Sequence, residues 1–302
     1  MDDIVLRTAK LRKYFRRVKA VEDVSLEVHR GSVFGFLGPN GSGKTTTIGM
    51  ILSLLRPNAG SVTLFGEPVT LGGNFPLRRV GSLMGLPALV PYMTARENLT
   101  LMSRLYPGIS PGRVDEVLEI VGLESVAKRN AGRFSSGMKQ RLGLGIALLH
   151  QPELLILDEP TNGMDPAGMH ETRNLLRKLA DAGMTVFLSS HLLHEVEQIC
   201  DEVAILSKGS IVAQGNIAAL LGKGNVTVKA RVPSPEEAAA VLRAQPGVTE
   251  AQANGAYVLV KGIPSEAVIV CLVSNGMVPN EVTTGRPDLE ELFLGLTGSD
   301  IS

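Results

Sequence analysis

One stretch decides the fold of this chain: Gly38-Pro39-Asn40-Gly41-Ser42-Gly43-Lys44-Thr45-Thr46. Two of its glycines bracket four residues and are followed by a lysine and a hydroxyl residue, which is the spacing of a phosphate-binding loop. The apolar run 33–37 precedes the loop and is short enough for a buried strand. The residues from Thr46 onward predict the opening of a helix. The loop therefore lies between a strand and a helix start, as its chemistry requires.

Anion binding by such a loop follows from its backbone. Glycines let the chain turn sharply and bring N–H groups close to an anion, because no Cβ intervenes. The first turn of the following helix adds unpaired donors and a partial positive charge. Lys44 is expected to reach the outer phosphates, and Thr45 to offer its hydroxyl to Mg²⁺. The strand–loop–helix context disfavours the alternative of a glycine-rich turn that binds nothing.

The composition predicts a globular protein of one large domain or two smaller ones. Lys plus Arg equals Asp plus Glu at 30 each, so the net charge gives no indication of a nucleic-acid partner. Cys200 and Cys271 are the only cysteines, and their apolar or helical surroundings predict buried thiols in a reducing cytosol. The N-terminus lacks the pattern of a signal peptide, and no apolar run reaches about eighteen residues. We therefore expect a soluble chain.

Two carboxylates follow a strongly apolar run. Residues 154–157 are all aliphatic, which indicates a central strand of a parallel sheet. Asp158 and Glu159 come next, and carboxylates at the carboxyl end of such a strand lie in the crevice where ligands bind. We expect Asp158 to hold Mg²⁺ and Glu159 to orient or deprotonate a water. The simpler alternative is an acidic pair that faces solvent.

A histidine follows a second buried strand. The strand is predicted over residues 185–190, and His191 stands at its end. A lone histidine is usually a satisfied polar group, but its place in the same sheet as a phosphate-binding loop predicts a role at the site. His194, three residues later in the next helix, is expected to cap that helix or to face solvent.

Other segments up to residue 220 alternate between short strands and helices. Thr94 with Glu97 three residues on forms a capping box, and a second helix over 110–121 is ended by Gly122. The stretch Phe134-Ser135-Ser136-Gly137-Met138 runs into an apolar helical pattern and is a second candidate anion site, with ordinary capping as the alternative. Tyr14 is interpreted as a core aromatic or as a stacking surface for a nucleobase. Strands are predicted over 4–6, 20–28, 61–66 and 80–84.

In this order the motifs resemble the ATP-binding subunits of ABC transporters, from residue 4 to about residue 220. The distinguishing piece is Phe134-Ser135-Ser136-Gly137-Met138, a divergent form of the family's LSGGQ signature. The strand that ends at Glu159 resembles the Walker B strand of the family. Asp165 lies in a stretch similar to its D-loop, and Ser189-Ser190-His191 resembles its switch histidine.

The resemblance implies that ATP is bound with Mg²⁺ and hydrolysed. Its catalytic residues are Lys44, Glu159 and His191, and its metal-binding residues are Thr45 and Asp158. A second copy of the subunit, or a paralogous one, would cover the γ-phosphate across a dimer interface with Ser135, Ser136, Gly137 and Met138, and Asp165 would belong to the D-loop. The implied contacts to ATP are Tyr14, which stacks on adenine, and Gly38, Pro39, Asn40, Gly41, Ser42, Gly43, Lys44, Thr45 and Thr46.

The sequence departs from the family pattern at several positions. Gly85 stands where the family usually has the Q-loop glutamine, and no glutamine occurs between Ser61 and Met138. A glycine has no side chain that could reach the metal ion or a water. This puts in doubt the usual contact to the metal and the strength of coupling between ATP hydrolysis and transport. Ser136 and Met138 replace a glycine and a glutamine of the signature, and Met164 replaces a leucine of the D-loop.

The last part of the chain has a different pattern. A strand over 226–232, a helix over 234–244, two strands around Asn254-Gly255, a helix over 265–274 and a strand over 278–284 give a βαββαβ order. The fold class predicted is therefore α/β: an ABC-type phosphate-loop NTPase with a mixed sheet core in residues 1–222, whose helical subdomain spans about 94–150. A small α+β ferredoxin-like accessory domain follows in 223–302, after a linker at 222–225, and a helix over 287–294 closes it. We interpret it as a packing or dimer-stabilising module rather than a ligand sensor.

The leading interpretation is an ATP-hydrolysing subunit that drives a separate multi-helix membrane permease. Export is favoured by the divergent signature and the C-terminal tail, by analogy with the family. We expect the protein to be cytoplasmic and peripheral on the cytoplasmic face of the membrane, without a nucleic-acid partner. Two alternatives stay open: a soluble ABC-type ATP switch acting on ribosomes or DNA, and a regulatory ATP-binding module that hydrolyses weakly.

Overall fold

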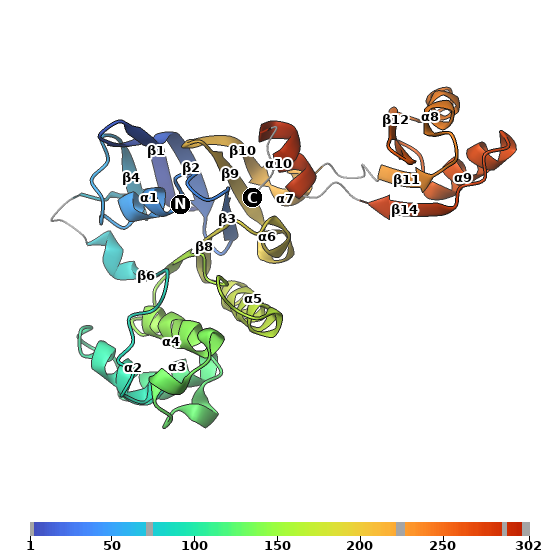
Figure 1. Cartoon of the computed structure of the whole chain (residues 1–302). Helices are drawn as coiled ribbons and strands as arrows, with labels where there is room; N and C mark the ends of the chain where they lie inside the picture. The colour runs from blue at the N-terminus through green and yellow to red at the C-terminus, as the bar shows by residue number, and fades with distance from the viewer. Residues whose placement is uncertain (1–2, 71–74, 222–226, 286–288, 298–302) are drawn as a thin grey trace. The chain divides into compact units, whose positions relative to one another are not determined.

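The computed structural model describes residues 3–70, 75–221, 227–285 and 289–297. Contacts divide the chain into two compact units, Met1–Asn216 and Ile217–Gly298 (Figure 1). This division falls slightly before the boundary predicted at 222. The predicted linker at 222–225 lies outside the described residues. In the described part of the chain, no helix is long and apolar enough to cross a membrane.

A mixed sheet is the core of the first unit. Its strand order is β5-β4-β1-β2-β10-β9-β3-β8-β7-β6, antiparallel at the β5 end and parallel from β9 to β6. The mixed α/β class predicted from the sequence is thereby confirmed. The strands are β1 Ile4–Phe15, β2 Val18–His29, β3 Val33–Leu37, β4 Ala59–Leu64, β5 Glu67–Pro68, β6 Val80–Met84, β7 Leu154–Asp158, β8 Thr185–Ser190, β9 Glu202–Ser207 and β10 Ser210–Asn216.

The parallel strands align their carboxyl ends. β3, β7 and β8 are buried along their whole length, as their apolar runs predict. In the register of the sheet, Leu37 pairs with Ser190, and Asp158 pairs with both Ser189 and Met84. The rings of Phe34 and Phe187 stack across β3 and β8, with centroids 5.6 Å apart. The segments that follow these strands therefore leave the sheet at one edge.

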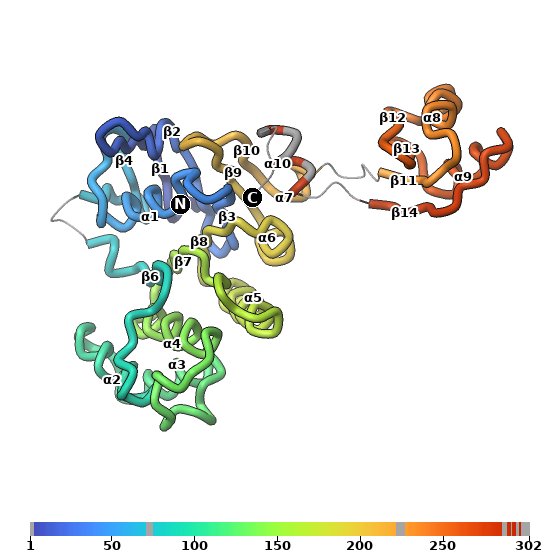
Figure 2. Tube along the Cα trace, viewed as in Figure 1, coloured from blue at the N-terminus to red at the C-terminus, as the bar shows by residue number. Residues whose placement is uncertain are grey.

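Helices lie around the sheet and form a separate group between β6 and β7 (Figures 1 and 2). In that group the capping box of Thr94 and Glu97 is formed at the start of α2, and Gly122 follows the end of α3 at φ 64°. Single 3-10 turns lie at Pro76–Arg79, Glu124–Val126 and Ala131–Arg133. The helices of this unit are α1 Lys44–Ile51, α2 Ala95–Ser103, α3 Arg113–Ile120, α4 Ser136–Leu148, α5 Pro166–Asp181 and α6 Leu193–Ile199.

The second unit has its own antiparallel sheet, in the order β12-β13-β11-β14. Its hairpin loop is Gly255-Ala256 rather than the predicted Asn254-Gly255, because Asn254 still pairs with Tyr257. The βαββαβ order is as predicted, and the ferredoxin-like class stays a prediction. The elements are α7 Ile217–Leu220, β11 Thr227–Arg231, α8 Pro235–Arg243, β12 Glu250–Asn254, β13 Tyr257–Lys261, α9 Ser265–Ser274, β14 Glu281–Gly285 and α10 Leu289–Thr297.

Candidate functional site

The phosphate-binding loop joins β3 to α1, as the sequence predicts. Gly43 precedes α1 at φ 111°, and a Cβ on it would lie 2.5 Å from the carbonyl oxygen of Ala20. A Cβ on Gly38 would lie 2.3 Å from the carbonyl oxygen of Leu206. Only glycine fits such close backbone approaches. No side chain caps α1, so its first N–H groups are available to an anion.

Lys44 lies within this loop, with its side chain only 6% exposed. Its ammonium donates to the carbonyl oxygens of Gly38 and Pro39 at 2.7 and 3.3 Å, and lies 3.2 Å from Oε1 of Glu159. A buried ammonium needs such anionic or carbonyl partners, because its desolvation is costly. A polyphosphate offers oxygens of the same kind, so the lysine can exchange these partners for a ligand.

Asp158 and Thr45 form a hydroxyl–carboxylate pair at the same edge of the sheet. Oγ1 of Thr45 donates to Oδ2 of Asp158 at 2.8 Å, and Oγ of Ser189 donates to Oδ1 at 2.6 Å. Asp158 is buried, and its place in β7 sets the carboxylate against the start of α1. A set of hard oxygen donors beside a phosphate loop fits Mg²⁺, which prefers oxygen ligands.

Glu159 has two partners for its carboxylate. Nδ1 of His191 lies 2.7 Å from Oε2, and the ammonium of Lys44 lies near Oε1. The backbone N–H of Glu159 donates to Oγ of Ser189 at 3.0 Å. The residue has φ 51°, a conformation that costs a non-glycine residue about 1 kcal/mol or more. Backbone strain held by several contacts at a ligand crevice is typical of functional residues.

A cavity of about 270 Å³ opens at this site. The phosphate loop and α1 form one wall, and the start of β2 with Lys19 forms another. Glu159 and Asn162 complete the lining. Asn162 was missed from the sequence, although its position three residues after Glu159 was a usable signal. Its contribution depends on how the loop after β7 turns back toward α1.

The signature residues do not line this cavity. Ser135 caps α4 by accepting a hydrogen bond from the backbone N–H of Met138 at 3.3 Å, and Ser135 and Ser136 are exposed. Gly137 and Met138 are partly exposed. Asp165 is likewise exposed and caps α5 through the N–H of Gly168 at 3.1 Å. Within one chain, these residues are not brought to the phosphate loop.

Two further positions that the sequence pointed to, Gly85 and Tyr14, do not line the phosphate-loop cavity. Gly85 directly follows β6, whose last residue pairs with Asp158; it has φ 63°, and a Cβ on it would meet nothing within 4 Å. Tyr14 is half-buried at the end of β1 and donates its backbone N–H to Oδ1 of Asn58. Phe15, next to it, has 44% of its surface exposed. Both aromatics stand before the same turn, so the sequence pattern fits Phe15 as well as Tyr14.

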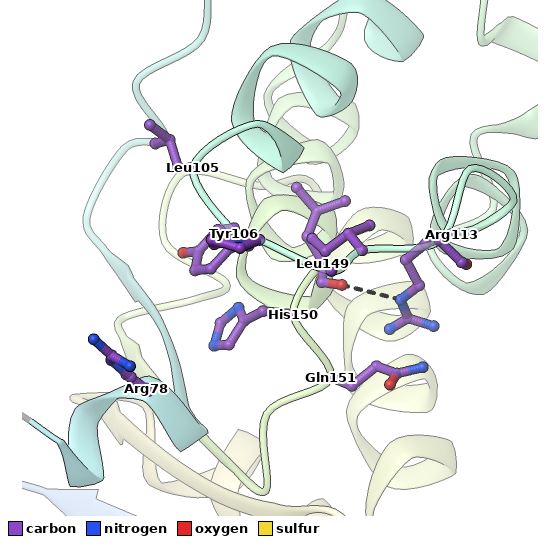
Figure 3. Close-up of a pocket in the computed structure, with 11 residues that line it drawn as sticks. Arg78, Leu105, Tyr106, Arg113, Leu149, His150 and Gln151 are labelled. Atoms are coloured by element: carbon purple, nitrogen blue, oxygen red, sulfur yellow. Dashed lines mark hydrogen bonds between the residues drawn. The ribbon is translucent and has the colours of Figure 1, made fainter.

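A larger cavity, of about 820 Å³, lies elsewhere, between the turn before β6 and the loop after α2 (Figure 3). There the rings of Tyr106 and His150 stack with centroids 4.5 Å apart, and Arg113 donates to the carbonyl oxygen of Leu149. Burial lowers the pKa of His150, which favours its neutral form. This cavity is larger than the phosphate-loop cavity, but neither a glycine-rich loop nor a carboxylate lines it. The smaller cavity is therefore the better candidate site.

Backbone donors, a buried ammonium and two carboxylates meet at the carboxyl edge of one parallel sheet. This arrangement defines a phosphate-loop nucleoside triphosphatase. A family model described as ABC transporter matches residues 21–162. The chain is 37% identical to the bacitracin transport ATP-binding protein BcrA of Bacillus licheniformis, over 97% of each chain. It belongs to the ABC transporter family.

Other known proteins agree with this assignment. The chain is 34% identical to the linearmycin resistance ATP-binding protein LnrL of Bacillus subtilis, over 97% of this chain and 98% of LnrL. A nucleotide-free ATP-binding cassette from an ABC transporter superposes with a TM-score of 0.64 at 30% identity, over 70% of this chain and 91% of the cassette. The structural match covers the ATP-binding cassette, and the two relatives cover 97% of this chain; none of these matches favours an ATP switch acting on ribosomes or DNA.

Proposed function

We propose that the chain is the ATP-hydrolysing subunit of an exporter and drives a separate membrane permease from the cytoplasmic face. The observation that supports this proposal is a contact network beside the phosphate loop. In it, Glu159 contacts both Lys44 and His191. Relatives named for bacitracin transport and linearmycin resistance support export. A cassette of Clostridium perfringens that superposes with a TM-score of 0.68 at 25% identity, over 74% of this chain and 92% of the cassette, is part of an ABC transporter complex, which supports a permease partner.

The residues take separate roles in the proposed mechanism. The N–H groups of the loop and of the first turn of α1 bind the phosphates, and Lys44 moves from the carbonyl oxygens of the loop to the outer phosphates. Glu159 orients the attacking water and accepts its proton, and His191 holds the Glu159 carboxylate in place. Thr45 and Asp158 would hold Mg²⁺, which would supply charge neutralisation at the phosphates.

Two aromatic residues are candidates for the adenine. Tyr14 is the position that the family resemblance implies, and Phe15 is the more exposed ring. A nucleobase that stacks on an aromatic side chain gains about 1–3 kcal/mol. We keep Tyr14 as the proposed stacking residue, with Phe15 as the alternative beside it.

A second chain completes the site in this proposal. The signature residues Ser135, Ser136, Gly137 and Met138 start a helix on an exposed surface, so their N–H groups can meet a phosphate bound by another copy. A lone phosphate loop leaves one side of the triphosphate in water, and a second helix N-terminus can cover that side. Asp165 is exposed at the start of α5 and is proposed to take part in the same interface.

The test is ATP turnover of the wild type against two variants. We expect Glu159→Gln to lower turnover about a hundredfold or more while Mg-ATP binding is kept, because the proton acceptor is lost. His191→Ala should also keep binding and lose most turnover. Glu119→Gln, on the exposed side of α3, is the matched control and should behave as wild type.

Unchanged turnover in Glu159→Gln would show that this carboxylate is not the catalytic group. Loss of nucleotide binding in His191→Ala would indicate a folding role instead. Co-purification of the tagged chain from detergent-solubilised membranes tests the transporter assignment separately. We expect a multi-helix membrane protein to accompany it; its absence, with ribosomes in its place, would contradict the proposal.

A further inference from the structure

The hairpin of β1 and β2 carries an unusual density of positive charge. Residues 10–19, named here the cationic hairpin, contain six lysines and arginines and no acidic residue, in a chain whose net charge is zero. Five of the six are exposed. Among the residues that the structure describes, Arg12, Arg16 and Arg17 make no ion pair, whereas Lys19 pairs with Glu22 at 2.7 Å. The six are Lys10, Arg12, Lys13, Arg16, Arg17 and Lys19.

The start of β2, which continues the cationic hairpin, is held against the phosphate loop by backbone contacts. The carbonyl oxygen of Ala20 lies so close to Gly43 that a Cβ there would clash at 2.5 Å. The N–H of Glu22 donates to the carbonyl oxygen of Gly209 at 2.8 Å. The N–H of Gly209 in turn donates to the carbonyl oxygen of Ser42 at 2.9 Å. Val18, Lys19 and Ala20 line the 270 Å³ cavity itself. Lys19 therefore lies at the proposed phosphate site, and the turn that carries Arg16 and Arg17 directly precedes the cavity-lining residue Val18.

The turn of this hairpin departs from ordinary turn chemistry. Arg16 and Arg17 form a two-residue loop between β1 and β2, and Arg16 has φ 53°. Such loops favour glycine or asparagine, because a positive φ strains residues with larger side chains. Two arginines here indicate a role other than making the turn, since locally unfavourable choices concentrate at functional sites.

We propose that the cationic hairpin recruits the nucleoside triphosphate by its charge and favours it over less charged nucleotides. This inference rests on the proposed function, since it concerns the same ligand. A cluster of like charges beside a concave site raises the local concentration of an oppositely charged ligand and speeds its association. The effect depends on ionic strength, because salt screens exposed charges beyond about 8–10 Å. These positive charges attract a triphosphate more strongly than a diphosphate, because the triphosphate carries more negative charge.

The turn offers a variant that removes charge without loss of fold. Arg16→Gly combined with Arg17→Asn places the residues that such a turn prefers, so we expect equal or higher thermal stability. Arg12→Gln, on β1, is a second variant that leaves the turn intact. The matched control is Lys128→Gln combined with Lys178→Gln, two exposed lysines outside the hairpin and outside the cavity lining.

The measurement is the association rate of fluorescent (MANT-labelled) ATP and ADP with Mg²⁺, by stopped flow, over a range of salt. At low salt we expect the turn variant to associate with ATP about three- to tenfold more slowly than wild type, and with ADP less affected. The dependence of the ATP rate on ionic strength should also become shallower, and the control should match wild type. The rates should converge in high salt.

Equal rates and equal salt dependence in wild type and both hairpin variants would overturn the inference, while the proposed function would stand. Absence of nucleotide binding in the wild type would overturn both. If the variants bind nucleotide normally but no longer sediment with vesicles of phosphatidylglycerol, the charges serve a membrane surface and the inference is wrong.

Discussion

At the scale of single residues, Glu159 shows how tertiary contacts hold a side chain ready for chemistry. Its backbone is strained at φ 51°, and its carboxylate is shared between Lys44 and His191. A carboxylate held by two cationic or hydrogen-bonding partners has few alternative rotamers. The geometry places it beside the phosphate loop, which is the arrangement that preorganised catalysis needs.

Gly85 stands where the family usually has the Q-loop glutamine, and a substitution can restore that side-chain amide. The space at its Cβ is open, so Gly85→Gln fits sterically, but its φ of 63° costs about 1 kcal/mol of stability. We expect the variant to raise ATP turnover severalfold, because a carboxamide at the end of β6 can contact the metal or the attacking water near Asp158. Turnover at saturating ATP and the melting temperature are the measurements.

Gly66 provides the matched control for this substitution. It stands in the turn between β4 and β5 at φ 81°, and a Cβ on it would also meet nothing within 4 Å. Gly66→Gln should lower the melting temperature by a similar amount and leave turnover unchanged. If Gly85→Gln is folded and its turnover equals that of the wild type, the site does not use an amide at this position.

At the scale of elements, Glu153 joins three segments at the start of β7. Arg79, in the turn before β6, donates to both of its carboxylate oxygens, and Arg30, after β2, donates to Oε2 at 2.9 Å. The N–H of Glu153 donates to the carbonyl oxygen of Arg79. The hydrogen bonds from Arg79 lower the pKa of Glu153 from 4.5 to about 2.

This shift predicts a dependence of stability on pH. Because the folded pKa is depressed, the contribution of Glu153 is fully present above about pH 4.5 and is lost as pH falls toward 2. The side chain is 39% exposed, so solvent screening reduces the effect to about 1 kcal/mol. In urea titrations, Glu153→Gln should therefore lower the free energy of unfolding by about 1 kcal/mol at pH 7, and by progressively less at lower pH.

Glu27→Gln is the control for this element. It removes an exposed pair with Arg7, whose side chains are 46% and 47% exposed, so its effect should stay below about 0.5 kcal/mol. A destabilisation of Glu153→Gln that does not change between pH 7 and pH 3 would show that the charge of Glu153 is not what stabilises this corner of the sheet.

At the scale of the whole molecule, we propose that two chains together complete the site. Glu159→Gln saturated with Mg-ATP should double the molar mass in light scattering, because bound ATP is not consumed and continues to join the phosphate loop of one chain to α4 of the other. Adding Ser136→Arg should keep the chain monomeric: Ser136 is exposed and does not cap α4, so the helix start stays intact.

Glu119→Arg in the same Glu159→Gln background is the matched control, since Glu119 is exposed on α3. It should leave dimer formation unchanged. A persistent monomer of Glu159→Gln with saturating Mg-ATP, or a dimer that tolerates Ser136→Arg, would contradict the shared site.

Local patterns determined much of this protein. The glycine spacing before Lys44, the aliphatic run before Asp158 and the capping box at Thr94 each act within a few residues, so the loop, strand β7 and the start of α2 were predictable from the sequence. The roles of Glu159 and His191 were inferred from the same strand ends, because carboxyl ends of parallel strands share one edge.

Only the tertiary structure decided which distant groups meet. Three contacts depend on the order β9-β3-β8-β7 and on β2 crossing beside the loop: that of Glu159 with Lys44, that of Asn162 with the cavity and that of Ala20 with Gly43. Strand order arises from packing between residues far apart in the sequence, so no short stretch of sequence determines it by itself. For that reason the sequence determined the chemistry of each residue, and the fold determined its partners.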